Sequence, residues 1–95
     1  MATTPAPFVQ AVTTVDDTAG GTIVLAAGRR NYLLIQNTGA NECYISLDGS
    51  AVTTANGFHL PAGSAPLELR EMSHKKAIKA ICSSSESTTV VVASF

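Results

Sequence analysis

Charged residues and aromatic rings are both scarce in this 95-residue chain. Only 14% of the residues are Asp, Glu, Lys or Arg, and the net charge is −1, whereas charged residues make up about a quarter of an ordinary soluble domain. A nearly neutral chain has no general electrostatic attraction for nucleic acids or anionic membranes. Trp is absent and aromatic residues reach only 5%. This scarcity argues against the stacking platforms of nucleic-acid modules and against a sugar-binding module.

Long apolar runs and closely spaced cysteines are also missing. No apolar run approaches the roughly 18 residues of a membrane-spanning helix. Residues 1–7 have neither the basic start nor the apolar centre of a secretory signal peptide, which predicts synthesis in the cytoplasm without a leader. The only cysteines, Cys43 and Cys82, lie far apart in the sequence. With no oxidising compartment indicated, we expect two free, buried thiols rather than a disulfide.

The residue patterns of catalytic and metal sites are weak. Neither His59 nor His74 lies in a local nucleophile signature, and there is no Gly-x-Ser-x-Gly elbow. Together with Cys43 and Cys82 these histidines have the chemistry of a zinc set, but their spacing forms no zinc knuckle. Gly20-Gly21 lacks the Lys and helix of a phosphate-binding loop. The sequence therefore predicts no catalytic residue, no metal, no other cofactor and no enzyme activity.

The chain consists instead of short β-prone runs separated by turns rich in Gly, Asn, Asp and Pro. No window carries a sustained helical pattern, and the best candidate, Leu69–Ile81, is interrupted by a polar segment that reads better as a turn. We expect an all-β fold, a single antiparallel β-sandwich that is jelly-roll-like with about seven or eight strands, over residues 8–95. The expected strands are Phe8–Thr14, Thr22–Ala26, Tyr32–Gln36, Cys43–Leu47, Gly57–Leu60, Pro66–Arg70, Ala77–Cys82 and Thr88–Phe95.

The most organised stretch runs from Tyr32 to Leu47. Its second half, Cys43–Leu47, alternates apolar and polar residues, while Tyr32–Gln36 is apolar on both faces, as in a strand covered on both sides. The linker Asn37–Asn41 contains residue types that tolerate positive φ, so we expect a β-hairpin. The core is expected to contain Ile23, Leu25, Leu33, Ile35, Ile45, Leu47, Leu67, Leu69, Ile78, Val90 and Val92.

A motif series links this chain to a known class of proteins. The series is Arg30-Asn31-Tyr32-Leu-Leu-Ile-Gln-Asn-Thr-Gly-Ala-Asn41, then Cys43-Tyr44-Ile45, Asp48-Gly49, Gly57-x-x-Leu60-x-x-Gly63 and the Val-rich segment Thr88–Ala93. Over roughly residues 22–93 it resembles small β-sandwich virion proteins of tailed bacteriophages, commonly capsid decoration (cement) proteins or head-fibre base domains. The resemblance implies a non-enzymatic structural role on the outer head surface, with the major capsid protein as partner and bridging of capsomers, often as a trimer.

The residues themselves suggest which parts would make such contacts. Extensive weakly polar surface and terminal strands that could supply unpaired edges favour a homo-oligomer, and the resemblance makes a homotrimer the expected form. Residues 1–7 form an expected extended N-terminal arm, because two prolines prevent a regular ladder, and the next residue would anchor the arm. A group of cations would form the polar rim rather than a nucleic-acid site. The candidate contact residues are Pro5, Pro7, Phe8, Arg29, Arg30, Lys75 and Lys76. The alternative is a carbohydrate-binding, receptor-binding or structural module of a phage tail or fibre.

Overall fold

The computed structural model of the chain describes residues 9–28, 32–63, 65–70 and 76–95, which contain strands and no helix. All eight expected strands are present, each within one residue of its predicted ends. They are β1 (Val9–Val15), β2 (Thr22–Leu25), β3 (Tyr32–Asn37), β4 (Cys43–Ser46), β5 (Phe58–Leu60), β6 (Leu67–Arg70), β7 (Ile78–Cys82) and β8 (Thr88–Ser94).

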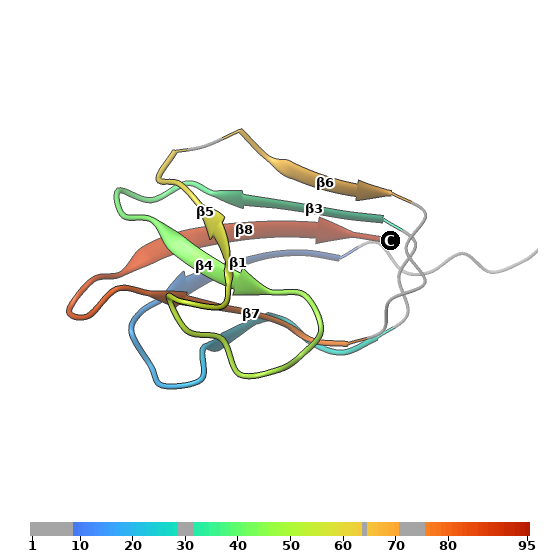
Figure 1. Cartoon of the computed structure of the whole chain (residues 1–95). Helices are drawn as coiled ribbons and strands as arrows, with labels where there is room; N and C mark the ends of the chain where they lie inside the picture. The colour runs from blue at the N-terminus through green and yellow to red at the C-terminus, as the bar shows by residue number, and fades with distance from the viewer. Residues whose placement is uncertain (1–8, 29–31, 64, 71–75) are drawn as a thin grey trace, which may run out of the picture.

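The strands form two four-stranded antiparallel sheets packed face to face (Figure 1). One sheet has the order β1-β8-β3-β6 and the other has the order β2-β7-β4-β5. Apart from the consecutive pair β4 and β5, each strand is followed by a strand of the opposite sheet. The first strand, β1, lies at the edge of its sheet and pairs with the last strand, β8, which lies inside the sheet. This strand order is that of an eight-stranded jelly roll. The predicted all-β antiparallel sandwich is confirmed.

The predicted β-hairpin between Tyr32 and Leu47 is wrong. Strand β3 pairs with β6 and β8, whereas β4 pairs with β5 and β7, so residues 38–42 cross from one sheet to the other. The linker also has no positive φ. Gly39 is required for another reason: a Cβ there would overlap the Thr88 hydroxyl and lie 2.6 Å from the Thr89 nitrogen, because the crossing chain runs close to the start of β8.

The core between the sheets contains most of the residues expected there. Seven of the eleven predicted residues are buried, and Leu47, Leu67 and Leu69 pack against them in part. Ile23 is a wrong prediction, since 54% of it is exposed. A shift in the pairing of β2 with β7 falls between Ile23 and Leu25 and turns both Val24 and Leu25 inward, as a β-bulge does.

The two cysteines are buried and free, as predicted. They are cross-strand neighbours, because Cys43 of β4 lies opposite Cys82 of β7. Burial, and secondarily the neighbouring Cys82, raises the pKa of the Cys43 thiol to about 12. Burial likewise raises the pKa of Cys82. Both groups are therefore thiols, not reactive thiolates, at neutral pH.

We expect neither thiol to react readily with a thiol reagent such as dithionitrobenzoate while the sandwich is folded. At pH 8 the labelling rate should be at least about a hundredfold lower than in guanidinium chloride, because the thiolate is the reacting form and access is blocked. The absorbance of the coloured thiolate that the reagent releases, followed over time, measures both rates. Rapid labelling of one cysteine in the native protein would place that residue outside the core.

Candidate interaction surface

The outer face of the β1-β8-β3-β6 sheet has an apolar centre. Strand alternation turns Val12, Leu34, Val91 and Ala93 away from the core, and the register places them in adjacent rows. Val12 lies opposite Val91, and Ala93 lies opposite Leu34. Val12 is 65% exposed, and the other three are half-buried. No layer of the described chain covers this face.

Two aromatic rings bound one end of this surface. Tyr32 and Phe95 are stacked, with ring centroids 5.0 Å apart and an angle of 19° between the rings. Their backbones exchange two hydrogen bonds, of 2.9 Å and 3.2 Å, which hold the end of the chain against β3. The Tyr32 hydroxyl donates to Glu68 Oε2 at 2.6 Å. We call Val12, Tyr32, Leu34, Val91, Ala93 and Phe95 the apolar face.

The six residues of the apolar face are uncharged, and the face ends at an edge strand. On this side of the sheet Glu68 is the only charged side chain that the structure describes, and the register places a second charged residue, Arg70, opposite Tyr32. At the other edge lies β1, which pairs with β8 on one side only. A surface of this kind can be covered by a partner without stripping water from many charged groups, a process that costs free energy.

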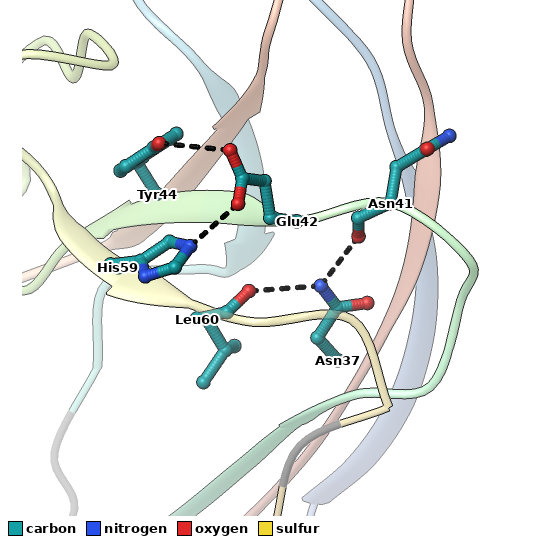
Figure 2. Close-up of polar contacts among 6 residues, drawn as sticks. All are labelled: Asn37, Asn41, Glu42, Tyr44, His59 and Leu60. Atoms are coloured by element: carbon teal, nitrogen blue, oxygen red, sulfur yellow. Dashed lines mark hydrogen bonds and ion pairs between the residues drawn. The ribbon is translucent and has the colours of Figure 1, made fainter.

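A cluster of titratable side chains lies on the opposite sheet (Figure 2). Glu42 Oε2 contacts His59 Nε2 at 2.9 Å, and the Tyr44 hydroxyl donates to Glu42 Oε1 at 3.1 Å. Tyr44 of β4 and His59 of β5 are cross-strand partners whose rings stack with centroids 5.2 Å apart. The hydrogen bond to His59, and then the one to Tyr44, lowers the pKa of Glu42, while the bond to Glu42 raises the pKa of Tyr44.

This cluster has a histidine and an orienting carboxylate but lacks the third member of a nucleophilic triad. Within the described ranges, no Ser, Thr or Cys side chain forms a hydrogen bond with His59. Both Glu42 and His59 are about half exposed, so water screens their attraction. The contact with Glu42 holds the His59 ring against Tyr44, so the cluster presents two stacked rings and one carboxylate at the surface.

Beneath this cluster, Asn37 connects the two sheets (Figure 2). Its Nδ2 donates to the carbonyl oxygens of Asn41 at 2.8 Å and Leu60 at 3.0 Å. Its Oδ1 accepts from the Gly39 nitrogen at 3.1 Å and from the Thr88 hydroxyl at 2.7 Å. These bonds use all four hydrogen-bonding positions of the amide. Asn37 is completely buried, so it is a structural clamp and not the turn residue that the sequence suggested.

Most of the contact residues predicted from sequence lie outside the described residues, namely Pro5, Pro7, Phe8, Arg29, Arg30 and Lys75. The remaining one, Lys76, is exposed and lies beside Gly49. This position adjoins the β4–β5 connection and not the apolar face. The sequence analysis did not identify Val12 as a surface residue, because an apolar residue in a strand gives no direct indication of exposure.

Metal and membrane features are absent from the part of the chain that the structure describes. It contains no group of three or more His, Cys, Asp or Glu side chains placed to hold a metal ion. Cys43 and Cys82 face the core, whereas His59 lies on the outer side of its sheet. The same described residues contain no helix long and apolar enough to cross a membrane.

Comparison with known proteins found no matching family, no matching curated protein and no matching solved structure.

Proposed function

We propose that this protein is a capsid decoration (cement) protein of a tailed bacteriophage, bound to the outer surface of the head and bridging capsomers. Its partner is the major capsid protein, and its role is structural rather than enzymatic. The observation that carries the proposal is the uncovered apolar face, with Val12 65% exposed and two stacked aromatic rings at one end. The motif resemblance of residues 22–93 to phage virion proteins supports the same assignment.

The physical argument rests on what such a face does in water. Covering apolar surface gains about 25 cal/mol per Å², and interface cores are depleted in charge and enriched in aromatic residues. The apolar face has both properties. A jelly roll supplies a rigid platform for it, since every strand is held by a ladder on at least one side. The fold alone does not specify a function, so the surface is what supports the assignment.

The proposal includes a homotrimer as the decorating unit. Strand β1 is the longest edge strand, with seven residues against four or fewer in the edges β2, β5 and β6. Long edge strands promote association unless they are covered, and closed cyclic assembly covers them. Residues 1–7, the arm expected from the sequence, lie outside the described residues, and the proposal has them reach a neighbouring subunit or capsomer.

The substitution Val12→Asp tests this function. It should weaken binding to phage heads that lack the protein by about 30-fold or more, because a charge at an interface centre costs about 2 kcal/mol or more. Cosedimentation with such heads, followed by the ratio of bound protein to major capsid protein, measures the effect. The thermal midpoint should change little, since Val12 is exposed.

Ile23→Asp is the matched control. Ile23 is also an exposed β-branched residue in an edge strand, 54% accessible, but it belongs to the other sheet. It should decorate heads as the unaltered chain does. If both variants decorate heads fully, or if both lose occupancy to the same extent, the assignment of the apolar face is contradicted. If the unaltered protein does not bind heads, the proposed function itself is contradicted.

A further inference from the structure

A hollow of about 370 Å³ lies between the end of β4, the β4–β5 connection and the start of β5. Its size falls near the lower end of the range of about 300–1,000 Å³ found for small-molecule sites. It is separate from both the apolar face and the Glu42 cluster. Its lining residues are Ile45, Ser46, Leu47, Asp48, Ser50, Asn56 and Phe58.

One part of the hollow is apolar. Ile45 belongs to the buried core, and Leu47 packs against that core. Phe58, the cross-strand partner of Ile45, is 64% exposed. An aromatic ring left this open next to a concave surface offers a flat apolar wall for a ligand. Its exposure is unexplained by the packing of the described residues.

The other part presents a fixed carboxylate. Asp48 Oδ1 accepts hydrogen bonds from the Ser46 hydroxyl at 2.9 Å, the Ser50 nitrogen at 3.0 Å and the Ser50 hydroxyl. These bonds, led by the Ser50 hydroxyl, lower the pKa of Asp48 to about 2, so the group is ionised at neutral pH. No donor in the described ranges contacts Oδ2, which leaves one strong acceptor held in a single orientation.

The surrounding charges limit the kind of ligand. Lys79 lies opposite Ser46 in the β4–β7 pair, and Lys76 lies beside Gly49. Two lysines therefore flank the Asp48–Gly49 segment, which favours a neutral ligand over a cationic one, and the Asp48 carboxylate would repel an anion. A neutral molecule with several hydroxyl donors and an apolar surface fits both parts of the hollow.

We propose that this hollow binds a single neutral sugar residue, free or at the end of a glycan. The sugar's hydroxyl groups would donate to Asp48 Oδ2, and its C–H surface would pack on Phe58. Hydrogen bonds to a charged acceptor are the stronger kind, and a few such contacts on an apolar wall are typical of small-molecule sites. The scarcity of aromatic residues argues against sugar binding in general, but one exposed ring in a hollow is enough for one sugar. The proposal does not depend on capsid decoration.

Saturation-transfer difference NMR with glucose, galactose, mannose and N-acetylglucosamine at millimolar concentration tests the site on the full chain. At least one of these sugars should receive saturation. Phe58→Ser and Asp48→Asn should each weaken binding of that sugar at least tenfold. The second variant keeps an oxygen for the two serines but replaces the free acceptor with an NH₂ donor.

His59→Ser is the matched control, because His59 follows Phe58 in β5 but faces the outer side of the sheet. It should bind the sugar as the unaltered protein does. Thermal midpoints of all three variants show whether the sandwich persists. The proposal is overturned if none of the four sugars binds, if a folded Phe58→Ser or Asp48→Asn variant retains full affinity, or if His59→Ser loses as much as they do. None of these outcomes bears on binding to heads.

Discussion

Replacement of Asn37 by Asp should lower the free energy of unfolding by about 3–5 kcal/mol at pH 7, the cost of leaving a buried charge without its partners. The two side chains have nearly the same shape, so packing changes little. The loss arises because the two N–H donors of Asn37 disappear. A carboxylate oxygen then faces the carbonyl oxygens of Asn41 and Leu60, which now lie 2.8 Å and 3.0 Å from the amide nitrogen. The loss of these donors, at roughly 1–3 kcal/mol for each carbonyl left unsatisfied, accounts for much of this total.

The same variant should show a characteristic pH dependence. Burial and the two carbonyl oxygens would raise the pKa of the new carboxyl group above its unfolded value of about 3.9. The folded state then binds more protons than the unfolded state between the two values, so stability falls as the pH rises through that interval. The deficit relative to the unaltered protein should therefore be smallest near pH 4. Denaturant unfolding at several pH values measures this difference.

Asn41→Asp is the control for that experiment. Asn41 lies in the same crossing segment, but its side chain makes one described bond, to the Ser87 carbonyl at 2.9 Å, at an exposed position. A typical hydrogen bond contributes about 1 kcal/mol, so this variant should lose no more than about that amount. If Asn37→Asp is equally mild, the two-sheet clamp does not contribute as its geometry indicates.

The sequence predicted the strands well because their signals are local. Alternating apolar residues and Gly, Asn or Pro turns lie within a few residues of each other. Strand pairing is not local. The role of Asn37 depends on Leu60 and Thr88, which are distant in the sequence, and the segment Asn37–Asn41 has the composition of a hairpin turn. The hairpin prediction failed because composition cannot show which sheet a strand joins.

The candidate surfaces were harder to predict for a related reason. An apolar residue in a β-strand is usually assigned to the core, which is how Ile23 was wrongly placed there, while the exposure of Val12 and Phe58 was not predicted at all. For Ile23 the cause is the shift in the β2–β7 register, which depends on a partner far along the chain. The sequence did contain one signal of the apolar face, because the run Tyr32–Gln36 is apolar on both sides of the strand. We interpreted this pattern as a strand covered on both sides, but the described residues cover only its inner side.

The pair Leu33→Ala and Leu34→Ala measures that difference directly. Leu33 is fully buried between the sheets, so its truncation should cost about 3–5 kcal/mol through lost burial and a residual cavity. Leu34 is its neighbour in β3 but lies half-buried on the apolar face. Its truncation should cost about 1 kcal/mol, because only part of the side chain leaves water on folding.

Denaturant unfolding of both variants gives the two values under the same conditions, and the identical substitution in adjacent positions removes differences in strand propensity. Equal and large losses would mean that the outer face of β3 is also covered in the isolated protein, for example by a second copy that persists in solution. That result would assign the apolar face to a contact between subunits and not to the proposed capsid contact. A small loss for Leu34→Ala together with weakened binding to heads would keep this face open in solution and covered only on the virion.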